Sequence, residues 1–137
     1  MDRLKGKVAI ITGGNSGVGE ATAKMFAKEG ATVVITARRE AALEKVAEEI
    51  KAAGGEVYAV STDISKKGDP ERLMDLVIEK YGKVDILVNN AGILEEGLKP
   101  IDRFSDEDLD RIVETNEKGT MRCMRAAAQK MQAGASI

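Results

Sequence analysis

A glycine-rich turn, set between an apolar run and an amphipathic segment, constrains the fold of this chain more than any other feature. The apolar run at residues 8–11 stops at Thr12, and glycines follow at positions 13, 14, 17 and 19. A helical pattern comes next, followed by a second apolar run at residues 33–35. This order predicts a strand, a turn, a helix and a second strand, a βαβ unit whose turn is suited to hold a phosphate.

The glycines of this turn have separate predicted roles. Gly13 permits a tight turn out of the strand, Gly17 lets the backbone approach a pyrophosphate, and Gly19 lets the helix pack closely on the strand. Asn15 and Ser16 are small and polar, which suits them to bond phosphate or ribose. The free N–H groups at the start of the helix would then face the anion.

Two other interpretations of the turn compete with this one. The phosphate loop of many ATP- and GTP-binding proteins ends in Gly-Lys-Ser/Thr. Here Gly19 is followed by Glu20, which argues against such a loop. The other alternative is a glycine turn without any ligand, and the complete strand–turn–helix–strand context weighs against it.

Apolar runs alternate with helical patterns along the whole chain. Strands are predicted at 7–12, 32–36, 56–60 and 84–88, and helices at 17–29, 40–53, 70–81 and 105–132. Such alternation, with mostly short loops, is typical of a parallel sheet with crossover helices. The predicted fold is therefore α/β, a doubly wound parallel sheet of the Rossmann type with the strand order 3-2-1-4.

The last predicted strand indicates that the sheet continues. Residues 86–88 are apolar in succession, a pattern typical of strands covered on both faces inside a parallel sheet. In the order 3-2-1-4 this strand would lie at the edge, where proteins normally avoid unpaired backbone groups. We therefore expect a further strand beside it that begins at residues 135–137, and a fold that is incomplete at its C-terminus.

A pair of arginines follows the second predicted strand. An acidic residue at this place usually bonds the ribose hydroxyls of NAD, but Ala37 stands there. Arg38 comes next and is suited to hold a 2′-phosphate through charge-assisted hydrogen bonds. NADP is therefore the expected cofactor, and NAD is less favoured. The alternative is that Arg38 and Arg39 are only solvated side chains at the start of a helix.

The composition excludes several classes of partner and site. The chain is 43% hydrophobic and 32% charged with a net charge of −2, which indicates neither nucleic acid nor a membrane surface as partner. The N-terminal residues MDRLKGK lack the apolar segment of a signal peptide, and the single cysteine, Cys123, fits a cytoplasmic location. The chain contains no histidine, which excludes His-based triads and His metal sites, and no metal site is predicted.

Four short motifs occur in order along the chain. They are TGGNSGVG at residues 12–19, STDI at 61–64, NNAG at 89–92 and ETNEKG at 114–119. Together they resemble the motifs of the short-chain dehydrogenase/reductase family, and the resemblance covers the whole chain. Combined with the arginine after the second strand, the resemblance implies cofactor contacts from Gly13, Asn15, Ser16, Gly17, Val18, Gly19, Arg38, Asp63, Ile64, Asn90, Ala91 and Gly92.

The residues themselves leave alternatives open for two of these motifs. Asp63 follows a predicted strand and could cap a turn, although a cap is compatible with the adenine contact that the family resemblance implies. Asn89 and Asn90 come at the carboxyl end of a strand, where ligands bind in open parallel sheets. These two residues could also form only the turn that ends the strand.

The last predicted helix carries an asparagine on its apolar face. One stripe of this helix comprises Leu109, Ile112, Val113, Asn116, Thr120, Cys123, Ala127 and Met131. An unpaired amide at Asn116 would cost about 1–3 kcal/mol in such a place, and Gly119 costs about 1 kcal/mol against alanine. The family resemblance implies that Asn116 belongs to the catalytic tetrad, where it bonds backbone and holds a water in a proton relay. The alternative is a buried asparagine that satisfies a helix kink. Cys123 is interpreted as a core residue.

The serine, tyrosine and lysine that complete the family's tetrad have no counterpart in these 137 residues. A Tyr-x-x-x-Lys motif is absent, because Tyr58 is followed four residues on by Thr62 and Tyr81 by Asp85. The resemblance therefore implies that residues 1–137 are a dinucleotide-binding domain, the N-terminal part of a longer single-domain enzyme. That enzyme would transfer a hydride between NADP(H) and a small carbonyl or alcohol substrate, and the chain alone is expected to be inactive.

Two other functions fit the same residues. One is a nucleotide-binding module without catalysis, and the other is a nucleotide-binding fold used only for oligomerisation. By analogy with the family, a homo-oligomer is expected, either a tetramer or a dimer.

Overall fold

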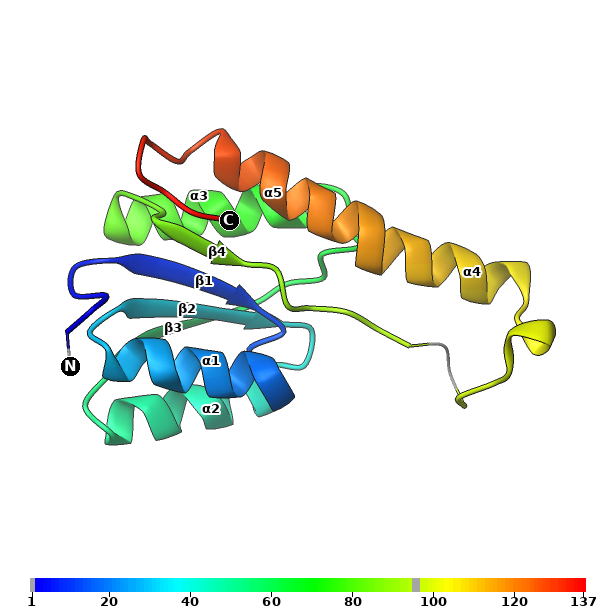
Figure 1. The fold of residues 1–137 in the computed structure, drawn as a ribbon, viewed down its shortest axis with the longest axis horizontal. Helices are drawn as coiled ribbons and strands as arrows, with labels where there is room; N and C mark the ends of the chain where they lie inside the picture. The colour runs from blue at the N-terminus through cyan, green and yellow to red at the C-terminus, as the bar shows by residue number, and fades with distance from the viewer. Residues whose placement is uncertain (1, 95–96) are drawn as a thin grey trace.

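The chain is built around a four-stranded parallel sheet (Figure 1). The computed structural model describes residues 2–94 and 97–137. Its strands are β1 (Val8–Thr12), β2 (Thr32–Ala37), β3 (Glu56–Ser61) and β4 (Ile86–Val88), and they lie in the order β3-β2-β1-β4. The pairings of β1 with β2, β1 with β4 and β2 with β3 are parallel, so the predicted doubly wound α/β fold is confirmed.

Helices cover both faces of the sheet. Helices α1 (Gly17–Lys28) and α2 (Glu40–Ala52) pack on one face, and α3 (Asp69–Tyr81) and α5 (Thr120–Ala128) on the other (Figure 1). Because successive strand residues point to opposite faces, Ile10 joins the apolar cluster beneath α3 and α5, while Ile11 joins the cluster beneath α1 and α2. Both side chains are fully buried, which explains why β1 is apolar in succession.

Strand β4 has a backbone partner on its outer side. The N–H of Leu87 donates to the carbonyl of Ser136 at 3.0 Å, and the N–H of Ser136 donates to the carbonyl of Asp85 at 2.9 Å. Ser136 and Ile86 thereby form a parallel bridge, so the predicted strand contact beside β4 is confirmed. The carboxyl ends of all these segments lie at one edge of the sheet.

The helix predicted over 105–132 has a different internal structure. It consists of α4 (Asp106–Ile112), a π-helical segment (Val113–Gly119) and α5, with Ser105 as the N-cap in a capping box with Asp108. Its predicted apolar stripe is correct only in α5, where Cys123 and Ala127 are fully buried. Leu109 and Val113 are 44% and 38% exposed. The π-helical turn contains one residue more than an α-helical turn. Residues counted at 3.6 per turn across it therefore no longer fall on the same face of the helix.

The start of α3 also differs from the sequence interpretation by one residue. The N-cap is Gly68, in the left-handed region at a φ of 90°, and Asp69 and Pro70 stand in the first turn. The helix therefore begins at the end of a tight connection from β3. The carboxylate of Asp69 is left facing that connection, where it accepts a hydrogen bond from the backbone of Asp63 at 2.8 Å.

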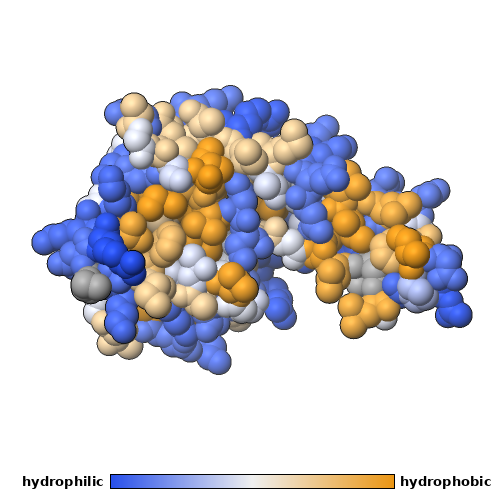
Figure 2. All heavy atoms as spheres, viewed as in Figure 1, coloured by the Kyte–Doolittle hydropathy of each residue, from blue (hydrophilic) through white to orange (hydrophobic). Residues whose placement is uncertain are grey.

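Apolar side chains gather on the surface away from the sheet. Figure 2 shows one group of orange atoms over the left centre of the molecule and another at its right, where Figure 1 places α4 and the connection that precedes it. Leu94, Leu98 and Ile101, in this connection, are each more than 70% exposed. In the described part of the chain, no helix has both the length and the apolar character needed to cross a membrane.

Candidate functional site

A cleft of about 630 Å³ lies across the carboxyl ends of the four strands. Residues from the connections that follow β1, β2, β3 and β4 line it: Thr12, Gly13, Asn15, Ser16, Gly17, Val18, Thr36, Ala37, Arg38, Arg39, Thr62, Asp63, Ile64, Asn90, Ala91, Gly92, Ile93 and Thr115. Eleven of the twelve predicted cofactor residues are in this set, and the twelfth, Gly19, lies buried behind the loop. In an open α/β sheet this edge is where ligands bind.

Gly13 and Gly19 in the glycine loop leave no room for a side chain, and Gly17 has a positive φ. Gly13 has a φ of 66°, and a Cβ there would come within 2.9 Å of Asn90 Nδ2. A Cβ on Gly19 would stand 2.1 Å from the carbonyl oxygen of Gly13, so any side chain there would push α1 away from the loop. Gly17 has a φ of 54° and open space around it, which keeps the entrance of the loop free.

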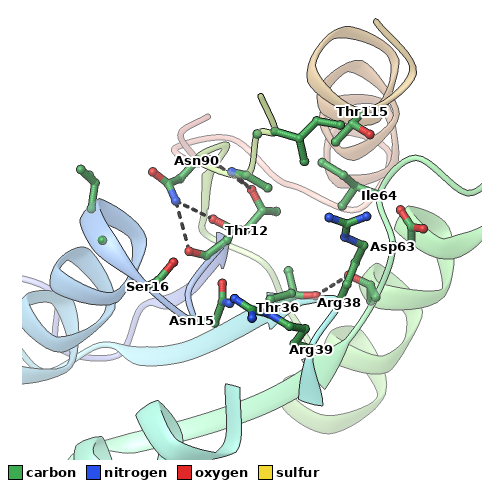
Figure 3. A pocket seen from close by; sticks show the side chains of 18 residues that line it. Thr12, Asn15, Ser16, Thr36, Arg38, Arg39, Asp63, Ile64, Asn90 and Thr115 are labelled. Carbon is green, nitrogen blue, oxygen red and sulfur yellow. Dashed lines mark hydrogen bonds between the residues drawn. The ribbon is translucent and has the colours of Figure 1, made fainter. Parts of the chain in front are cut away.

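The first turn of α1 opens into the cleft. Ser16 is its N-cap in an extended conformation, and the Ser16 side chain makes no capping hydrogen bond. The first N–H groups of α1 therefore remain available to an anion, and the positive end of the helix dipole adds to that attraction. Figure 3 shows Asn15 and Ser16 on this side of the cleft.

Thr12 and Asn90 tie the glycine loop to the connection after β4. The hydroxyl of Thr12 accepts hydrogen bonds from the backbone N–H groups of Asn90 and Ala91, both at 3.0 Å. The side-chain amide of Asn90 donates to the carbonyls of Thr12 and Gly13 at 3.1 and 3.2 Å. Thr12 was not among the predicted site residues. The one signal for it in the sequence is its place as a polar residue at the end of an apolar strand.

Two arginines stand between the glycine loop and the connection after β3. Arg38 and Arg39 are exposed, and Figure 3 shows them between Asn15 on one side and Asp63 on the other. Among the described residues, no ion pair is found for either guanidinium. The backbone beneath them is held in place, because the Ser61 hydroxyl donates to the carbonyl of Arg38 at 3.0 Å.

Asp63 closes a turn and also lines the cleft. Its Oδ1 accepts hydrogen bonds from the N–H and the hydroxyl of Ser65, at 3.0 and 2.6 Å. Its own N–H donates to Asp69, and that bond, together with Arg72, outweighs burial and holds the pKa of the Asp69 carboxyl below its usual value. The two interpretations of Asp63, turn cap and cleft residue, are therefore compatible in this fold.

Asn116 lies beside the cleft rather than in its wall. Its Oδ1 accepts from the N–H of Ile93 and its Nδ2 donates to the carbonyl of Ile93, both at 2.8 Å. Ile93 lines the cleft, and so does Thr115, a buried residue that the sequence interpretation missed. Both Thr115 and Asn116 belong to the π-helical segment, a deviation that is frequent at functional sites.

The buried thiol and the acidic side chains offer little further chemistry. Burial, with a smaller contribution from Glu71, raises the pKa of Cys123 to about 12, so this thiol stays protonated and unreactive. Within residues 2–94 and 97–137, no group of three or more His, Cys, Asp and Glu side chains is arranged to hold a metal ion.

Comparisons with known proteins identify the family of this chain. Residues 7–137 match the model of the short chain dehydrogenase family. An uncharacterized oxidoreductase of Listeria innocua is 42% identical over 118 residues, which cover 86% of this chain and 47% of that protein. A 3-oxoacyl-[acyl-carrier-protein] reductase of Thermotoga maritima is 38% identical over 117 residues, covering 85% of this chain and 47% of that protein.

A solved structure agrees with these sequence matches. A metagenomic short-chain oxidoreductase in complex with NADP superposes with a TM-score of 0.86 at 36% identity, over 92% of this chain and 57% of that protein. The chain thus spans about half the length of the curated relatives that it matches.

Proposed function

The chain belongs to the short-chain dehydrogenase/reductase family, and from that premise we propose that it forms the NADP(H)-binding part of an oxidoreductase that acts on a small carbonyl or alcohol substrate. The enzyme would transfer a hydride between the cofactor and that substrate. The dinucleotide-binding domain would comprise residues 1–137 and would be the N-terminal part of a longer single-domain enzyme.

The observation that carries this proposal is the cleft itself. It runs without interruption from the glycine loop past Arg38 to Asp63, and from the same loop to Asn90 and Gly92. Its volume suits a large ligand. At the glycine loop, nothing lies within 4 Å of the place that a Cβ on Gly17 would take, and the Ser16 side chain leaves the first N–H groups of α1 uncapped. The residues present therefore fit a dinucleotide with its pyrophosphate at the start of α1.

The preference for NADP is proposed from the end of β2. Ala37 offers no carboxylate that would repel a 2′-phosphate, and Arg38 and Arg39 stand exposed in the cleft. A guanidinium without an ion-pair partner in the described structure is free to form charge-assisted hydrogen bonds to phosphate oxygens. Asp63 and Ile64, on the far side of the arginines, would contact the adenine.

The reacting end of the cofactor is proposed to lie near Asn90, Ala91 and Gly92. The bound cofactor would supply or accept the hydride, and the protein would orient it and exclude competing water. Asn116 is proposed to take part in proton transfer there. Its two hydrogen bonds to Ile93 leave one N–H and one lone pair of the carboxamide for a water.

A nucleotide-binding module without catalysis is the second candidate, because this chain contains no Tyr-x-x-x-Lys motif. The two candidates share the cleft and differ in the presence of turnover. A homo-oligomer, either a tetramer or a dimer, and a cytoplasmic location remain predictions.

Isothermal titration calorimetry with NADP and NAD tests the proposal directly. We expect NADP to bind more tightly than NAD by about tenfold or more, as one charge-assisted contact would give. If neither dinucleotide binds at millimolar concentration, the proposed function is wrong. If both bind equally, the cofactor preference alone is wrong.

A further inference from the structure

Arg122 is a charged residue of α5 whose side chain is largely buried. Its side chain is only 13% exposed, although it stands one turn from the surface residue Arg125, which is 64% exposed. Arg122 Nη1 donates to the carbonyl of Ser65 at 3.0 Å and pairs with Glu114 Oε1 at 2.7 Å. Burying a guanidinium costs desolvation free energy. The two short contacts of Arg122 offset this cost and suggest that its position has a function.

Both partners of Arg122 belong to segments of the candidate site. Glu114 is in the π-helical segment next to Thr115 and Asn116. Glu114 also pairs with Lys118 at 3.3 Å, and Arg122 and Lys118 together hold the pKa of its carboxyl below the usual value. Glu114 therefore remains ionised at neutral pH, and its ion pair with Arg122 is retained.

Ser65 links Arg122 to Asp63, a residue that lines the cleft. Its carbonyl is held by Arg122, while its N–H and hydroxyl donate to Oδ1 of Asp63 at 3.0 and 2.6 Å. Among the described residues, the hydrogen bonds to the carboxylate of Asp63 end on this one oxygen. The other oxygen, Oδ2, is left to the cleft that Asp63 lines.

A second contact packs the same loop against the end of the π-helical segment. A Cβ on Gly119 would come within 2.9 Å of Ile64 Cγ1 and 3.0 Å of the Ile64 carbonyl oxygen. Glycine at this position therefore lets Ile64 pack directly on the helix backbone, where it is 6% exposed. Two neighbouring residues of the loop, Ile64 and Ser65, are thus fixed by the helix that also carries Asn116.

We propose that Arg122 is a positioning residue for the adenine end of the cleft: it holds Asp63 through Ser65 and ties this loop to the π-helical segment through Glu114. The proposal rests on the proposed function, since it assigns Asp63 to the adenine end of a dinucleotide. Without Arg122, the loop loses its polar tether to the helix, and ordering Asp63 for each binding event then weakens the affinity.

Four variants of the full-length enzyme test this role. Arg122→Met removes the charge and the hydrogen bonds and keeps most of the aliphatic volume, and Arg122→Lys retains the charge. Arg125→Met is the matched control, because it removes one ion pair of α5, with Glu71, that has no contact with the loop. Ser65→Ala, which removes only the hydroxyl bond to Asp63, serves if Arg122→Met does not fold.

The readouts separate the two ends of the ligand. Affinities are measured for NADP, for adenosine 2′,5′-bisphosphate and for nicotinamide mononucleotide, and kcat is measured at saturating NADP. We expect Arg122→Met to weaken NADP and the bisphosphate by about threefold to tenfold. Its affinity for the mononucleotide and its kcat should not change, Arg122→Lys should recover part of the loss, and Arg125→Met should behave as the wild type.

The possible outcomes distinguish this role from the proposed function. Unchanged binding of the bisphosphate by Arg122→Met, or an equal loss in Arg125→Met, overturns the positioning role while the proposed function stands. An equal loss for all three ligands also overturns it, because the adenine end is then not singled out. If the wild type binds neither NADP nor the bisphosphate, the proposed function fails and this inference fails with it.

Discussion

Asn116 holds the backbone of Ile93 with both ends of its carboxamide: Oδ1 accepts from the N–H of Ile93 and Nδ2 donates to its carbonyl, each at 2.8 Å. Ile93 follows the segment 89–92 and lines the cleft. The π-helical segment is thereby fastened to the connection after β4. An asparagine on a half-buried helix face, costly in isolation, is here paired on both sides.

Asn116→Ala in the full-length enzyme should lower kcat by at least about tenfold, because the side chain would no longer order Ile93 or a water for proton transfer. The dissociation constant of NADP should change little, since most cofactor contacts lie elsewhere. Loss of the two hydrogen bonds should also destabilise the protein by about 1–3 kcal/mol. Steady-state kinetics, calorimetry and urea unfolding measure these three quantities.

Asn116→Leu is the control that separates catalysis from packing. A side chain whose only role was packing could be replaced by an apolar residue of similar size with kcat retained. Full kcat in the Leu variant would show that the assignment of Asn116 to the catalytic machinery is wrong.

Arg38→Ala should weaken NADP binding by about 1.5–3 kcal/mol and leave NAD nearly unchanged, because one charge-assisted contact to the 2′-phosphate is lost. Titration of both cofactors against the wild type and the variant measures the difference. Lys28→Ala, at an exposed position in the last turn of α1, is a control for the loss of one positive charge. Equal losses of NADP and NAD affinity in Arg38→Ala would contradict the assigned role.

The 137 residues alone should show no dehydrogenase turnover, because they contain no Tyr-x-x-x-Lys motif. The measurement is the loss of the near-ultraviolet absorbance of NADPH, which the oxidised cofactor lacks, in the presence of a panel of ketones. A blank without protein gives the background. Sustained oxidation above that background would refute the prediction.

Gly19→Ala should destabilise the protein by about 1–3 kcal/mol and abolish NADP binding, because the new Cβ has no room next to backbone. The Cβ would stand 2.1 Å from the carbonyl oxygen of Gly13. Gly92→Ala is the matched control for stability, since its Cβ would have its nearest contact at an ordinary 3.5 Å. Thermal unfolding and calorimetry are the measurements, and equal Tm values for the two variants would argue against the close packing of α1 on the loop.

Asp108→Asn should lower Tm at neutral pH, and this difference from the wild type should disappear in acid. The ammonium of Lys99 at 2.8 Å, followed by the N–H of Ser105, lowers the pKa of Asp108 from 3.8 to about 2. A carboxyl whose pKa is lowered by folding stabilises the native state above its unfolded pKa. That stabilisation is lost as the pH falls from 3.8 through about 2.

Thermal unfolding between pH 7 and pH 2 measures this effect. Asp110→Asn, on the exposed side of the same helix, is the control and should leave Tm unchanged. A constant difference between Asp108→Asn and the wild type over the whole pH range would contradict the prediction.

Much of the sheet and of the cleft could be predicted because the signals are local. The strand order follows from alternating apolar runs, and eleven of the predicted cofactor residues line one cleft because parallel strands present their carboxyl ends at one edge. The ties that shape the cleft are not local. Thr12 meets Asn90 across 78 positions and Arg122 meets Ser65 across 57, so only the folded chain reveals them.

The apolar stripe of the last helix fails for a different reason. A count at 3.6 residues per turn assumes one kind of helix, and the π-helical segment interrupts it at the functional residues. Leu109 and Val113 are therefore exposed, although they share the counted stripe with the buried Cys123.

A helix of this kind is sensitive to its exact length. Each residue in an α-helix accounts for about 100° of rotation about the axis. Because a π turn holds one residue more than an α turn, deleting one residue between Val113 and Gly119 would let the segment relax to an ordinary α-helix and would leave the orientation of α5 unchanged. Inserting one residue there would instead turn α5 by about that angle. Cys123 and Ala127 would then leave the core, and Arg122 would no longer point at Ser65. In this segment a substitution changes one side chain and a deletion removes the extra residue, whereas an insertion changes the alignment of two walls of the cleft.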